Sequence, residues 1–182
     1  MAWHEGLSVF LLDTSVLSDM VNPSRPLHAK AVAFKNQYAG EEQCLFICVI
    51  SLAEMQFGLD LYEGRASRPS QADLDVVRGH INAASNISAP LEVTRHVALE
   101  QGQLRAKWAR KLAPNKAAQG KLKGSPPERW SNDWPATELQ ITENDIWIAA
   151  TALTHDLTLV TCDKDFDKLA EVESQLRIIR IQ

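Results

Sequence analysis

The sequence predicts an α/β fold, a mainly parallel sheet of four to five strands flanked by helices. Short apolar runs at 7–12, 44–50 and 157–161 have the length and composition of buried strands. Helical segments separate these runs, and strands that alternate with helices form parallel sheets. Acids follow the first and third runs closely, at the sheet edge where ligands of such folds gather.

The N-terminal third contains two predicted helices and the second strand. After the first apolar run the chain turns helical until "NPSRP" at 22–26, where two prolines break the helix. Residues 27–38 carry apolar side chains at amphipathic spacing. In the helix after the strand at 44–50, we expect Ser51 to cap the start and Gly64 to mark the end.

The middle of the chain predicts mostly helix. Residues 71–84 and 95–112 have helical patterns, and 87–93 is a candidate short strand between them. Further on, 142–156 predicts a helix with Thr142 as N-cap and an acid, Asp145, at its third position.

The C-terminal end predicts a last strand at 177–181. The length of 182 residues is most simply one domain, residues 1–182, with a long excursion at about 113–140. This excursion contains four prolines and also Trp130 and Trp134, which we expect to anchor the loop on the domain rather than stack on bases.

The composition is that of an ordinary globular protein, with 45% hydrophobic and 23% charged residues. No apolar run approaches the ~18 residues that span a bilayer, and the N-terminus lacks the basic region of a signal peptide. Three cysteines without dense spacing suit a reducing compartment. We therefore expect a cytoplasmic protein with no membrane contact.

Five acids lie at predicted junctions on the same edge of the sheet: Asp13, Glu54, Asp145, Asp163 and Asp165. Clustered carboxylates raise one another's pKa or require a cation, and oxygen ligands favour Mg²⁺ or Mn²⁺. Helix macrodipoles alone would account for single acids in first turns. The joint pattern favours a metal site, which can make a metal-bound hydroxide and stabilise a phosphoryl transition state.

A basic segment interrupts this acidic chain of net charge −4. Between residues 105 and 129 lie eight basic residues and one acid, Glu128, which gives the segment a charge of +7. A field of that sign attracts polyanions such as nucleic acid, although a solvated helix face that runs into a loop would have the same composition.

Four stretches, "LLDTSVL", "ISLAEMQFGL", "NDIWIAATAL" and "LVTCDKDF", together resemble a PIN-domain ribonuclease, in particular the VapC-type toxin of a type II toxin–antitoxin pair. The resemblance covers nearly the whole chain. It implies a PIN-like three-layer fold and an acidic, Mg²⁺- or Mn²⁺-dependent site that cuts RNA. It also implies a cognate antitoxin that covers the groove, and a toxin commonly paired as a homodimer.

Carried onto this sequence, the resemblance makes Asp13, Glu54, Asp145 and Asp163 the catalytic acids. Metal ligands would come from Asp13, Asp145 and the "TCDKDF" stretch, where Asp163 or Asp165 could fill the last position. We favour Asp163 because it lies closer to the strand end. Thr14 matches the family's small hydroxyl residue after the first acid and is expected to support a ligand carboxylate.

The chain is longer than small toxins of this type, and much of the excess falls at 113–140. We expect the neighbouring basic side chains to bind phosphates that flank the cut; these are Arg110, Lys111, Lys116, Lys121 and Lys123. The competing interpretation is that they receive an acidic stretch of a partner.

Two other functions remain open on the sequence alone. An aspartyl-phosphate phosphatase would use Asp13 as nucleophile, but such enzymes have a second acid two residues on, where this chain has Ser15. A catalytically silent module with the same fold could bind RNA or protein, although the presence of all four acids argues against it.

Overall fold

A computed structural model describes residues 9–38, 44–120 and 141–182. Its centre is a four-stranded parallel sheet with the order β2-β1-β3-β4. The strands are β1 (Phe10–Leu12), β2 (Leu45–Phe46), β3 (Thr158–Thr161) and β4 (Ile178–Arg180). The parallel α/β fold predicted from the alternating pattern is confirmed.

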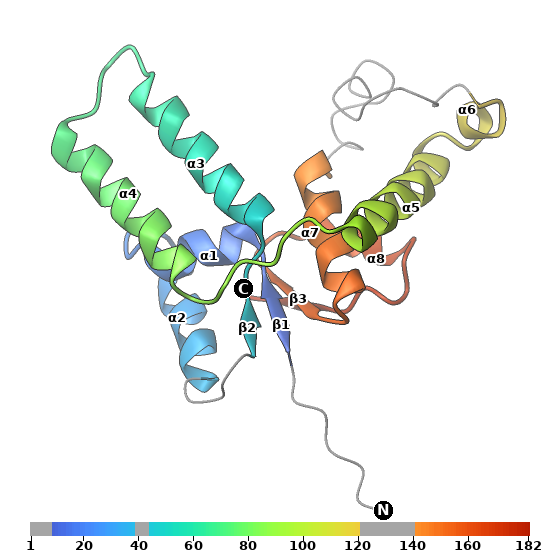
Figure 1. The fold of residues 1–182 in the computed structure, drawn as a ribbon, viewed down its shortest axis with the longest axis horizontal. Coiled ribbons are helices and arrows are strands. Elements are labelled where there is room, and N and C mark those ends of the chain that lie inside the picture. The colour runs from blue at the N-terminus through green and yellow to red at the C-terminus, as the bar shows by residue number, and fades with distance from the viewer. Residues whose placement is uncertain (1–8, 39–43, 121–140) are drawn as a thin grey trace, which may run out of the picture.

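Helices cover both faces of this sheet. They are α1 (Thr14–Val21), α2 (His28–Gln37), α3 (Val49–Glu63), α4 (Gln71–Ser85), α5 (Arg95–Leu112), α6 (Pro114–Ala118), α7 (Glu143–Thr154) and α8 (Phe166–Ala170). Figure 1 shows α3 and α4 projecting as a pair on one side of the sheet and α5 with α7 on the other. The first turn of α7 lies against α3, because the side-chain amide of Asn144 donates to Glu54.

The alternation of side chains along β1 and β3 divides the core into two layers. Leu11 and Leu159 pack with α5, α7 and α8 around Trp108. Leu12 and Val160 face the opposite way and pack with α1 and α2. Burial on both faces explains why these strands are continuous apolar runs in the sequence.

Most predicted helices agree with the structure to within a few residues. Helix α7 begins after the N-cap Thr142, and Asp145 completes a capping box there. Gly64 is the C-cap of α3, as predicted. The pattern at 95–112 corresponds to α5 residue for residue.

Two predictions in the middle of the chain are wrong. Helix α3 begins at Val49 with Cys48 as N-cap, so β2 is shorter than 44–50 and Ser51 lies buried inside the first turn. The segment 87–93 forms only an isolated bridge between Leu91 and Cys48. The preceding residue, Pro90, has no N–H to extend that pairing.

The excursion at 113–140 lies mostly outside the described residues. Its first part contains α6, and Trp130, Trp134, Lys121 and Lys123 lie beyond the residues that the structure describes. Division of the chain into a single domain of 1–182 with this excursion stays a prediction.

Candidate functional site

Asp13 lies at the end of β1 and is also the N-cap of α1. The residue is 4% exposed, and its Oδ1 accepts a hydrogen bond of 2.7 Å from the Thr14 backbone N–H. Its Oδ2 accepts from the hydroxyls of Ser15 at 2.6 Å and Thr161 at 2.8 Å. Burial raises the pKa of Asp13, and these three donors partly oppose that shift.

Glu54 lies in α3, one turn past the start of the helix. Thr14 connects it to Asp13, because Thr14 donates its backbone N–H to Asp13 and its hydroxyl to Glu54. The Thr14 hydroxyl donates to Oε2 of Glu54, and the side-chain amide of Asn144 donates to Oε1 at 2.9 Å. Both donors are neutral, so they orient the carboxylate without neutralising it. Thr14 thus holds the Glu54 carboxylate, and its expected support of a ligand carboxylate stays a prediction.

Asp145 is held in the first turn of α7. Its Oδ2 accepts from the backbone N–H of Thr142 at 2.7 Å and from the Thr142 hydroxyl at 2.8 Å. Burial raises the pKa of Asp145 to about 7, and the negative charges of Asp13 and Glu54 add to the rise although the Thr142 bonds lower it. The three carboxylates therefore influence one another's charge.

The topology explains why acids so distant in sequence lie at the same edge of the sheet. Asp13 follows a strand directly, and Glu54 lies in the helix that follows the neighbouring strand. Helix α7 precedes β3 and returns along the sheet, so its first turn is at the carboxyl ends of the strands. The three acids therefore share one edge of the sheet.

The donor set of Asp13, Glu54 and Asp145 fits a divalent cation. Within the described ranges none of the three has an ion pair with lysine, arginine or histidine, and hard oxygen donors are the ligands that Mg²⁺ and Mn²⁺ prefer. In the same part of the chain, no three Asp, Glu, His or Cys side chains form a preassembled metal cluster. The acids thus share an edge without being gathered into a coordination sphere.

Asp163 and Asp165 occupy the loop after β3. Oδ1 of Asp163 accepts from the Asp165 backbone N–H at 2.8 Å, and Oδ1 of Asp165 lies 3.3 Å from the Lys168 ammonium. Asp165 is thus already paired with a cation, whereas no ion pair of Asp163 is found in the described ranges. This difference favours Asp163 as the fourth site acid, which stays a prediction.

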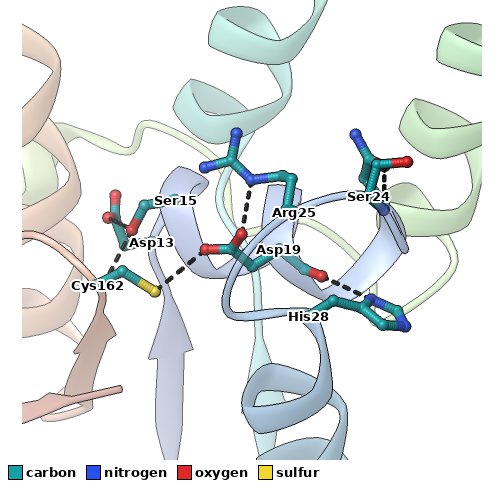
Figure 2. Close-up of polar contacts among 8 residues, drawn as sticks. Asp13, Ser15, Asp19, Ser24, Arg25, His28 and Cys162 are labelled. Carbon is teal, nitrogen blue, oxygen red and sulfur yellow. Dashed lines mark hydrogen bonds and ion pairs between the residues drawn. The ribbon is translucent and has the colours of Figure 1, made fainter. Parts of the chain in front are cut away.

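Two hydroxyls connect Asp13 to the loop that carries Asp163. The Ser15 hydroxyl accepts from the Cys162 backbone N–H at 3.1 Å, and the Thr161 hydroxyl accepts from the Asp163 backbone N–H at 2.9 Å. Figure 2 shows Ser15 between Asp13 and Cys162. Sequence reasoning assigned no such role to Ser15, Thr161 or Asn144; their only signal was adjacency to the acids.

The basic face of α5 is partly neutralised. Lys107 is paired with Glu173 and Lys111 with Glu171, and Arg105 lies 3.7 Å from Glu143. Arg110 is exposed, and the side chains of Lys116, Lys121 and Lys123 lie outside the described part of the structure. Phosphate binding by this segment stays a prediction.

Across the described residues, no helix combines the length and apolar character needed to span a bilayer.

Most of the chain matches one known protein family. The family described as PIN domain matches residues 10–172. No curated protein matches the chain.

The solved structures that share this fold include three with similar TM-scores. A chain of VapBC2 from Rickettsia felis bound to a DNA fragment from their promoter has a TM-score of 0.62 at 17% identity, covering 96% of this chain and 99% of that one. FitAcB from Neisseria gonorrhoeae has a TM-score of 0.59 at 20% identity, and the match covers 94% of this chain and 97% of that one. DNA-bound VapBC from Salmonella typhimurium has a TM-score of 0.58 at 20% identity, and the match covers 96% of this chain and 99% of that one. At these identities the similarity is one of fold.

Proposed function

Because this chain belongs to the PIN domain family, whose members are generally nucleases, we propose that it is a metal-dependent endoribonuclease. The observation that carries the proposal is the group of three carboxylates, Asp13, Glu54 and Asp145, at one edge of the sheet. They are held by neutral donors and have no cationic partner among the described residues. Such a group is costly unless a cation binds it.

Asp13, Asp145 and Asp163 would hold a Mg²⁺ or Mn²⁺ ion, and Glu54 would lie beside it. The ion, when bound, supplies an activated water and stabilises the charge that develops on the phosphodiester. The hydroxyls of Ser15 and Thr161 keep Oδ2 of Asp13 fixed. Thr14 and Asn144 orient the Glu54 carboxylate in the same way.

The wider assignment is a toxin of a type II toxin–antitoxin module that acts in the cytoplasm on an RNA substrate. Support comes from the four sequence stretches and from neighbours described as VapBC and FitAB assemblies. A cognate antitoxin and a homodimer are parts of this proposal. A short adjacent reading frame that encodes a DNA-binding protein would support the assignment if that protein copurifies with this chain.

The test is cleavage of a mixed single-stranded RNA by the purified chain with Mg²⁺ or Mn²⁺, with EDTA, and after Asp13→Asn. We expect cleavage that EDTA and the substitution both abolish. Cleavage that survives both would contradict the metal mechanism. RNA binding without cleavage by the intact chain under every metal condition would favour the silent binding module instead.

A further inference from the structure

A second buried carboxylate, Asp19, lies in α1 beside the site and has both oxygens bonded. It is 2% exposed, Nε of Arg25 donates to its Oδ1 at 2.7 Å, and the Cys162 thiol lies 3.4 Å from its Oδ2 (Figure 2). Asp19 therefore acts as a fixed acceptor for the Arg25 side chain.

The loop between α1 and α2 holds Arg25 in place. The backbone N–H of Arg25 donates to the Asn22 carbonyl at 3.1 Å, and the Arg25 carbonyl accepts from the His28 N–H at 3.2 Å. The His28 ring nitrogen Nδ1 lies 2.9 Å from the Asp19 carbonyl oxygen, which can only accept, so Nδ1 is the donor. A loop fixed at both ends limits where the guanidinium can lie.

The outer nitrogens of Arg25 remain available. The side chain is 43% exposed, and its only bond to the described residues is the one from Nε to Asp19. Figure 2 shows the other two nitrogens directed away from that carboxylate. These Nη groups form the planar fork that binds a phosphate through two parallel hydrogen bonds.

Arg25 lines the same cavity as two residues of the site. The lining of a cavity of about 260 Å³ includes Thr14 and Glu54 from the site and also Arg25, Asn22 and His80, together with apolar side chains of α1, α3 and α4. It runs between α1, α3 and α4, away from the basic α5. Glu54 repels anions, so an anionic group that enters this cavity is favoured beside Arg25.

We propose that Arg25 binds a phosphate of the RNA next to the one that is cut, and that Asp19 orients it for this role. The inference rests on the proposed nuclease function. An RNA phosphate is favoured over a partner's acidic side chain because the cavity includes Thr14 and Glu54, where the substrate backbone has to pass. The Asp19 bond uses Nε and leaves the fork to the ligand, an arrangement that lysine could not reproduce.

The test measures the affinity for a fluorescein-labelled single-stranded RNA 12-mer, by anisotropy, with Asp13→Asn as background to prevent cleavage. Arg25→Gln combined with Asp19→Asn removes both charges together, so no buried carboxylate is left unpaired. We expect the Kd to rise about tenfold. In the background with Asp13 intact, KM should rise while kcat changes little, because the contact forms in both ground and transition states.

Arg177→Gln is the matched control, because that arginine is similarly exposed and paired with Asp156 but lies at the opposite end of β3. It should leave the Kd unchanged. If the double variant melts at a much lower temperature than the unaltered chain, Arg25→Lys serves as the second variant. It keeps a cation beside Asp19, removes only the fork and should also raise the Kd.

An unchanged Kd in a folded Arg25 variant would overturn the inference, and is what a protein-binding role for Arg25 predicts. Failure of the proposed function looks different: the chain with Arg25 intact would cut no RNA under any metal condition, whatever the Kd of the Arg25 variants.

Discussion

The Thr161 hydroxyl lies 2.8 Å from Oδ2 of Asp13, although 148 residues separate them in sequence. The same hydroxyl accepts from the backbone N–H of Asp163 at 2.9 Å. One side chain at the end of β3 therefore fixes both the first site acid and the loop that carries the fourth candidate. Thr161 is fully buried, so water cannot replace these bonds.

Replacing Thr161 by Val keeps the shape and removes the hydroxyl. We expect a loss of about 1–3 kcal/mol in the free energy of unfolding, because two buried groups lose a partner. RNA cleavage should fall more steeply than the folded fraction, because Asp13 and Asp163 are no longer held together. Thr161→Ser retains the hydroxyl and should recover most of the cleavage rate. Equal cleavage by the Val variant and the unaltered chain would contradict this coupling.

Asp145→Asn should separate the function of this residue from its structural role. The amide oxygen can still accept from Thr142, but the charge that burial disfavours is gone. Because the folded-state pKa is raised from 3.8 to about 7, ionisation costs stability increasingly as the pH rises through that interval. In EDTA at pH 8, the melting temperature of the variant should exceed that of the unaltered chain by roughly 2–4 °C for each kcal/mol gained in the free energy of unfolding. The difference should be smaller at pH 5.

The same Asn variant should lose cleavage and should gain little from Mg²⁺. The unaltered chain should melt higher when Mg²⁺ is added, because an ion that binds only the folded state stabilises it. Calorimetry at both pH values checks these expectations. An Asn variant that is less stable than the unaltered chain at pH 8 in EDTA would mean that the charge of Asp145 is compensated within the protein.

The pair of Lys107 with Glu173 should make stability depend on acid pH. The hydrogen bond from Lys107 lowers the pKa of Glu173, which is buried. Its contribution is therefore present above pH 4.5 and is lost as the pH falls through the lowered value. Lys107→Met should cost about 1 kcal/mol at pH 7 and much less near pH 3, measured by urea unfolding.

Lys111→Met is the control for that experiment, because its partner Glu171 has a side chain 62% exposed and surface pairs contribute little. Its cost should be smaller at pH 7. A cost for Lys107→Met that is the same at both pH values would assign the effect to packing of the lysine stem.

The sequence predicts the strands of this fold well where they are buried on both faces, as in β1 and β3. It fails at 87–93, where a proline and a long-range bridge decide the structure. The acids Asp13, Glu54 and Asp145 could be placed at one edge because strand ends define that edge. The hydroxyls of Ser15 and Thr161 could not, because serine and threonine are common and their roles depend on tertiary distances. The roles of Asp19 and Arg25 could not be predicted either, because they also depend on tertiary distances.

The basic segment offers a prediction independent of the acids. Lys107 and Lys111 are paired with glutamates, so RNA binding should depend more on the residues that follow them. Replacing Lys116, Lys121 and Lys123 by Ala should weaken RNA binding and reduce the slope of log K against log salt, by ~0.7 for each phosphate of a single strand that the protein no longer neutralises. Replacing Lys30, Lys35 and Lys164 removes the same charge elsewhere and should change the slope less. If the two triple variants behave alike, net charge rather than this segment governs RNA affinity, and the phosphate role of the segment is wrong.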